Sequence, residues 1–96
     1  MSDISTGDGW RAFLELCGKF QRKEELEELF DLFFTLEEKE ALSKRHSLVK
    51  ALLDEKMTQR EISEAMRVSI SKITRGSNAL KIISKQLREA LKKKMA

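Results

Sequence analysis

Residues 58–75 read TQREISEAMRVSISKITR, and this stretch contains the starts of two helices. Thr58 and Glu61 have the spacing of a capping box, in which a hydroxyl and a carboxylate satisfy the exposed amides of a first helical turn. We expect this helix to end near Met66. A tight turn, Arg67-Val68-Ser69, follows, and its last residue is a favourable N-cap for a second helix.

The two helices form a predicted helix-turn-helix over residues 58–82, a unit common in DNA-binding proteins. Ile62 and Ile73 would anchor it from inside, and Val68 would fill the angle between the helices. The side chains between these anchors are short or cationic and can form hydrogen bonds, as a DNA-reading helix requires: Ser71, Lys72, Thr74 and Arg75. A capped helical hairpin with a solvated face is the alternative interpretation.

Position 67 departs from the usual pattern, because the turn of a helix-turn-helix commonly has glycine there. Arg67 must therefore adopt an unfavourable positive φ, or the turn must have a different geometry. The sequence leaves both possibilities open.

The whole chain of 96 residues predicts an all-α fold of about six short helices. It has no proline, four glycines and 36% charged residues, a composition that favours helices over strands. We expect a flexible N-terminus over residues 1–8 and one helical domain over residues 9–96. Apolar residues at helical spacing mark the inward faces of the other helices: Trp10, Phe13, Leu14, Cys17 and Phe20; Leu26, Leu29, Phe30 and Phe33; Leu42, Val49, Leu52 and Leu53; and Leu87, Leu91 and Met95.

Further helix starts are visible outside the helix-turn-helix. Thr35 and Glu38 form another capping-box pattern before a long central helix, and Ser84 can cap the last helix. In the helix before Thr35, Leu32 and Phe34 lie outside the main apolar face. This helix therefore has apolar residues on two sides and needs two surfaces to pack against. In a chain this short, the second surface could belong to another subunit.

Charge divides the chain into an acidic and a basic half. Residues 1–43 contain five basic and eleven acidic residues, whereas residues 44–96 contain fourteen basic and five acidic residues. A basic half suits nucleic acid, although it also suits an acidic membrane surface. No signal peptide and no membrane-spanning apolar run are visible, so we expect a cytoplasmic protein without a membrane partner.

The composition argues against an enzyme and against a metal site. Cys17 is the only cysteine, so no internal disulfide can form, and we expect a buried structural thiol. His46 is the only histidine, and one histidine with one cysteine makes neither a metal-ligand cluster nor an activated nucleophile.

Three segments resemble the Trp repressor family: TLEEKEALSKR at 35–45, MTQR at 57–60 and ITRGSNALK at 73–81. The similarity extends over about residues 9–96, and ITRGSN after a helix-turn-helix is its most specific part. The resemblance implies an intertwined helical homodimer that binds a palindromic operator in double-stranded DNA. L-Tryptophan would be the co-repressor, with no prosthetic group, and the regulated genes would serve tryptophan biosynthesis or salvage.

The resemblance also assigns an L-tryptophan site to Arg45, Arg75, Gly76, Thr35, Leu32 and Ala79. The two arginines match residues that flank the indole, and one of them also binds the carboxylate, as guanidinium groups can. Gly76 matches a residue that leaves room for the ring. Taken alone, Arg45 would indicate a surface ion pair and Arg75 a phosphate contact.

The remaining ligand contacts follow from the same resemblance. Thr35 and the backbone carbonyl of Leu32 match contacts from the other subunit. Ala79 stands where the best-known members have a serine that helps to hold the amino group, and Phe34 replaces a leucine. These differences predict altered affinity for tryptophan or altered preference among indole analogues.

The resemblance implies DNA contacts at Arg60, Ile70, Ser71, Lys72 and Thr74. Ser63 stands where a well-known member has lysine, which predicts a weaker contact there. Ser71 and Lys72 replace alanine and threonine, which allows a different operator sequence. Two alternatives remain: a helix-turn-helix protein that binds DNA without a ligand, and a helical adaptor that binds another protein through its apolar surface.

Overall fold

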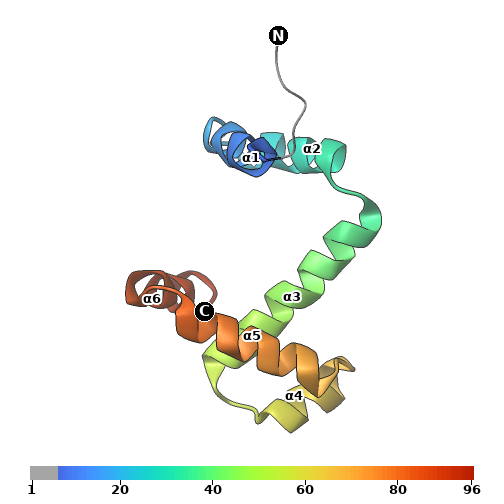
Figure 1. Cartoon of the computed structure of the whole chain (residues 1–96), viewed down its shortest axis with the longest axis vertical. Coiled ribbons are helices and arrows are strands. Elements are labelled where there is room, and N and C mark those ends of the chain that lie inside the picture. Colours follow the sequence, from blue (N-terminus) through green and yellow to red (C-terminus); the bar gives the residue numbers. More distant parts are fainter. Residues whose placement is uncertain (1–6) are drawn as a thin grey trace. The chain divides into compact units, whose positions relative to one another are not determined.

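The computed structural model describes residues 7–96, and within them the chain forms six α-helices and no strand (Figure 1). This confirms the predicted all-α fold. Residues 1–6, most of the expected flexible N-terminus, lie outside the described residues. The helices are α1 (Gly9–Gly18), α2 (Lys23–Phe33), α3 (Leu36–Asp54), α4 (Gln59–Met66), α5 (Ile70–Ile82) and α6 (Lys85–Lys94).

The chain divides into two compact units, one ending at Glu38 and the other comprising Lys39–Ala96. In the first unit, α1 and α2 meet through an aromatic cluster of Trp10, Phe13, Phe30, Phe33 and Phe34. The Phe13 ring centroid lies 5.1 Å from that of Phe33, 5.8 Å from that of Phe34 and 6.1 Å from that of Phe30. Neither helix contains a buried residue.

Several sequence-based expectations for the first unit need correction. Phe34 does pack inside the unit, because α2 ends at Phe33 and the extended backbone at Phe34 directs its ring onto Phe13 and Phe30. Phe33, expected to face inward, is 51% exposed. Cys17 is partly exposed rather than buried.

The core of the second unit lies where α4 and α5 meet α3. Ile62 and Ile73 are fully buried, and Leu48 of α3 packs against them. Leu42, expected to face inward, is 56% exposed, whereas the buried residues of α3 are Leu48 and, as expected, Leu53. In Figure 1, α4 and α5 lie side by side, with α6 continuing from the end of α5.

Hydrogen bonds at helix starts explain where the helices begin. The Thr35 and Glu38 pair makes both reciprocal bonds of a capping box before α3, at 2.9 and 3.1 Å. Ser84 caps α6 by accepting the Leu87 N–H at 3.1 Å. The Arg88 guanidinium donates to the Leu80 carbonyl and so fastens α6 to the end of α5.

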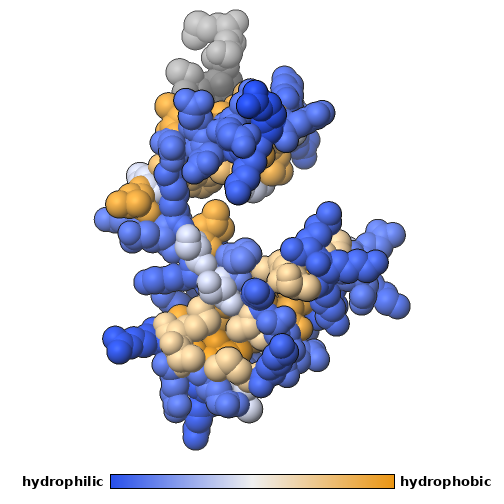
Figure 2. Space-filling view, turned by 180° about the vertical axis from the view of Figure 1, so that it is seen from behind, coloured by the Kyte–Doolittle hydropathy of each residue, from blue (hydrophilic) through white to orange (hydrophobic). Residues whose placement is uncertain are grey.

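A large apolar surface stays exposed in both units. Figure 2 shows it as orange patches between blue charged side chains. Among the described residues, ten large apolar side chains are at least 40% exposed, including Leu32 at 78% and Ile82 at 84%. Within residues 7–96, no helix is long and apolar enough to cross a membrane.

Candidate nucleic-acid and ligand site

The α4–α5 pair begins at a complete capping box. The Thr58 N–H donates to Glu61 Oε1 at 3.0 Å, and the Glu61 N–H donates to Thr58 Oγ1 at 3.1 Å. The bond from the Thr58 backbone N–H, followed by that from its hydroxyl, lowers the pKa of the Glu61 carboxyl. This helix start was predicted from the sequence and is confirmed.

The turn between α4 and α5 has arginine in a left-handed conformation. Arg67 has φ 54° and ψ 46°, so of the two possibilities left open by the sequence, the arginine accepts the positive φ. The N–H groups of Arg67 and Val68 both donate to the Ser63 carbonyl. Ser69 then caps α5 by accepting the Lys72 N–H at 3.3 Å, as predicted.

Ser63 has a structural role that the sequence analysis missed. Its Oγ donates to the Val68 carbonyl at 2.7 Å, so side chain and carbonyl together hold the turn. The only signal in the sequence is a short hydroxyl residue near a helix end, where such residues commonly bond to the backbone. The structure therefore gives Ser63 a role in the turn itself.

All five residues predicted to contact DNA are exposed on the α4–α5 pair. Ile70, Ser71, Lys72 and Thr74 lie in the first five residues of α5, and Arg60 lies on α4. The Thr74 hydroxyl donates to Gln59 Oε1 at 3.4 Å, a link between the two helices that sequence reasoning did not find. Ile70 is 49% exposed, and an apolar side chain there can meet a thymine methyl.

The charge of this region favours an anionic partner. Residues 56–75 contain five basic and two acidic residues, and the first turn of α5 contains no acidic residue. Within the described part of the chain, Arg60 and Lys72 have no ion-pair partner. Exposed, unneutralised cations on a rigid helix pair can bind phosphate groups.

Helix α5 approaches α3 closely at Gly76. A Cβ atom at this position would lie 3.4 Å from Leu48 Cδ2 and 3.4 Å from Leu52 Cδ1. Arg45 precedes Leu48 by three residues and Leu52 by seven, so it lies on the same face of α3. Arg75 and Ala79 are four residues apart and flank Gly76 on α5, and both are exposed.

Four of the six predicted ligand residues thus lie on the two helices that meet at Gly76, and their part in a ligand site stays a prediction: Arg45 on α3, and Arg75, Gly76 and Ala79 on α5. Leu32 and Thr35 lie in the first unit, at the end of α2 and just before α3, and their part in a shared site stays a prediction. The Leu32 carbonyl lies in the last turn of α2, where carbonyls lack a partner within the helix.

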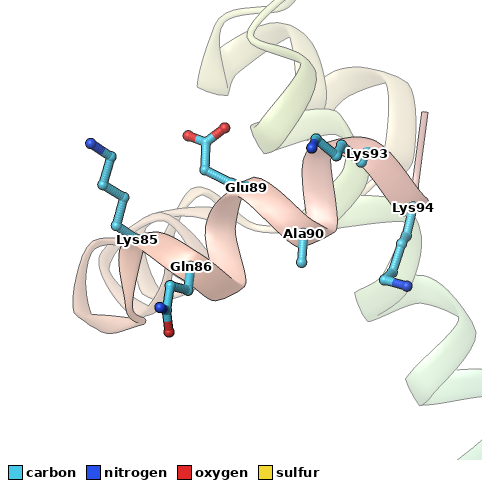
Figure 3. Close-up of a pocket in the computed structure, with 6 residues that line it drawn as sticks. All are labelled: Lys85, Gln86, Glu89, Ala90, Lys93 and Lys94. Atoms are coloured by element: carbon cyan, nitrogen blue, oxygen red, sulfur yellow. The ribbon is translucent and has the colours of Figure 1, made fainter.

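A shallow hollow lies along one helix, α6, and none of the predicted ligand residues lines it. Figure 3 shows its lining side chains projecting from α6 with no opposing element among them: Lys85, Gln86, Glu89, Ala90, Lys93 and Lys94. Within residues 7–96, no group of three or more His, Cys, Asp or Glu residues could hold a metal ion.

Comparisons with known proteins match nearly the whole chain. A family model described as Trp repressor protein matches residues 8–95. The Trp operon repressor homolog of Chlamydia caviae is 48% identical over 92 residues, which cover 96% of this chain and 91% of the relative. The homolog of Chlamydia trachomatis serovar D is 47% identical over 87 residues, 91% and 93% of the two chains. That of Vibrio cholerae serotype O1 is 39% identical over 82 residues, 85% and 80% of the two chains.

Proposed function

The chain belongs to the Trp repressor family, whose members are transcription regulators and not enzymes, and from this premise we propose that it represses transcription by binding operator DNA in response to L-tryptophan. The exposed face of the α4–α5 pair carries the proposal. In a helix-turn-helix the second helix enters the major groove while the first crosses the backbone. Helix α5 offers hydroxyl, cationic and apolar side chains to base edges, and Arg60 on α4 can meet phosphate.

The active form in this proposal is a homodimer. Within residues 7–96 of the single chain, ten large apolar side chains are exposed, and an apolar surface of this kind marks an interaction site in a small protein. Two chains related by a twofold axis would present two α5 helices to a palindromic operator. The family resemblance favours a second copy as the partner.

L-Tryptophan would bind beside the α3–α5 junction. The guanidinium groups of Arg45 and Arg75 can stack on the indole, and one of them can pair with the carboxylate. Leu32 and Thr35 of the partner chain would complete the site. The Leu32 carbonyl can accept from the ammonium group, and the Thr35 hydroxyl, which accepts the Glu38 N–H, still has its proton to donate.

Ligand and DNA binding would be linked through the position of the α4–α5 pair. If tryptophan favours the arrangement that fits the operator, the operator must increase tryptophan affinity by the same factor. When tryptophan is scarce, the protein would leave the operator and transcription would begin. Genes of tryptophan biosynthesis or salvage are the expected targets.

A calorimetric titration with L-tryptophan tests the co-repressor part of this proposal. We expect one site per chain, lost in Arg75→Ala and kept in Lys81→Ala, which removes another exposed cation from α5. An absence of binding heat at several temperatures would instead favour a DNA-binding protein that has lost its ligand, for which Ala79 is the suspected cause. An absence of salt-dependent DNA binding would favour the helical adaptor.

A further inference from the structure

The turn of the helix-turn-helix contains a cation whose role is not explained by the fold. Arg67 ends α4 with φ 54°, a conformation that glycine adopts without the steric penalty of a Cβ atom. Its backbone N–H donates to the Ser63 carbonyl, but any residue other than proline could make this bond. The side chain is exposed, whereas its neighbours Met66 and Val68 pack against the core.

Within the described residues, the Arg67 guanidinium has no hydrogen-bond or ion-pair partner. The acidic residues of α4 do not hold it, since Glu61 serves the capping box and Glu64 makes no ion pair with it. The side chain is thus exposed, outside the core cluster and unpaired among residues 7–96. Its charge is available to a partner.

The position of Arg67 indicates which partner. It lies three residues before α5, whose first turn presents Ile70, Ser71 and Lys72 to solvent and contains no acidic residue. Backbone strain alone does not mark the site, because Glu55 has nearly the same φ of 55° in the loop after α3. The distinguishing features of Arg67 are its positive charge and its place beside the DNA-reading helix.

We propose that Arg67 is a further DNA contact and binds a backbone phosphate beside the groove that α5 enters. The inference rests on the proposed function of the α4–α5 pair. A guanidinium group can donate two parallel hydrogen bonds to a phosphate. Such a contact strengthens binding to every sequence and carries no base preference.

The test compares Arg67→Gly, Arg67→Ala and Arg67→Lys with the wild-type chain. Each protein, with L-tryptophan, is titrated against a duplex that the wild-type chain selects from a random pool, and against the same duplex with one base pair changed. Titrations at several salt concentrations give the slope of log affinity against log salt. Arg11→Ala is the control, because it removes an exposed arginine from α1 in the other unit.

We expect Arg67→Gly and Arg67→Ala to bind both duplexes about tenfold more weakly at 0.1 M salt, with the ratio between the duplexes unchanged. In these two variants, the slope of log affinity against log salt should become shallower by about 0.9 for each DNA-reading head. Arg67→Lys keeps the positive charge and should have most of the wild-type slope. Thermal unfolding separates binding from folding, since Arg67→Gly should unfold at a higher temperature than the wild type.

Arg67→Gly with wild-type affinity and wild-type slope would overturn the phosphate contact and leave the proposed function intact. Equal losses in Arg67→Gly and in Arg11→Ala would also overturn it, because net charge alone would then explain the effect. A wild-type chain without salt-dependent binding to any duplex would overturn the proposed function, and the contact at Arg67 with it.

Discussion

Replacing Gly76 with alanine separates two roles that a glycine can have in the middle of α5: close helix packing and room for a ligand. Glycine inside a helix is about 0.8–1.0 kcal/mol less favourable than alanine. The new Cβ atom would lie 3.4 Å from Leu48 Cδ2 and from Leu52 Cδ1, at the near limit of ordinary van der Waals contact. The fold therefore has space for it, and we expect Gly76→Ala to stabilise the protein by about 1 kcal/mol.

The assay is thermal unfolding without ligand at one protein concentration, because the stability of the proposed dimer would depend on concentration. A gain of about 1 kcal/mol corresponds to a rise in Tm of about 4–8 °C for a chain of this size. Asn78→Ala is the matched control, since Asn78 is an exposed residue within α5 and its replacement gains helix propensity without adding an atom at the junction.

Tryptophan binding should respond in the opposite direction. If this space is fitted to the ring, an added methyl group costs about 1–3 kcal/mol, so Gly76→Ala should bind L-tryptophan about 5-fold to 150-fold more weakly, while Asn78→Ala should bind normally. A Gly76→Ala protein that is less stable than the wild type would show that the glycine serves α3–α5 packing. Unchanged tryptophan affinity would refute its place in the ligand site.

Three further predictions concern single side chains. Ser63→Ala should lower the free energy of unfolding by about 0.5–1 kcal/mol in denaturant titrations, because the turn loses the bond to the Val68 carbonyl. The higher helix propensity of alanine offsets part of this loss, and an unchanged denaturation midpoint would contradict the prediction. Ala79→Ser should bind L-tryptophan about twofold to tenfold more tightly by calorimetry, since it restores one hydrogen bond, and equal affinity would place the residue outside the site. The lowered pKa of Glu61 stabilises the folded state above the pKa of the unfolded chain, and this contribution is lost as pH falls through the folded pKa. Glu61→Gln should therefore have a shallower dependence of Tm on pH below about pH 4.5 than the wild type, and parallel curves would exclude this contribution.

Local signals were sufficient to predict α4, the turn and α5. The caps at Thr58 and Ser69 depend on neighbours three residues away, so sequence spacing reveals them. The anchors at Ile62 and Ile73 were visible as apolar positions facing inward from two short helices, although their packing partner Leu48 lies on α3. The positive φ at Arg67 was one of two possibilities, and only the structure decided between them.

The sequence-based predictions of burial were wrong where packing between helices decides which apolar residues are covered. Leu42 and Leu48 are both compatible with an apolar face of α3, but α4 and α5 cover only Leu48. Phe34 packs inside its unit because α2 ends one residue earlier and the backbone extends there. Ser63 and Gln59 act through bonds to residues five and fifteen positions away, which no helical periodicity describes.

The proposed tryptophan site is the part least accessible to local reasoning. Arg45 and Gly76 are thirty-one positions apart in the sequence, and their relation becomes visible only because Leu48 and Leu52 connect α3 to α5. Without the family resemblance, each of these residues has a plain structural interpretation. With it, the α3–α5 junction becomes a testable site.

The central claim is tested most directly by measuring DNA affinity with and without L-tryptophan at one salt concentration. The DNA is a duplex that the protein selects from a random pool in the presence of the amino acid. Coupling between two sites typically changes affinity by about 5-fold to 150-fold, and we expect tighter DNA binding with tryptophan within that range. Equal affinity in both conditions would contradict tryptophan-linked repression.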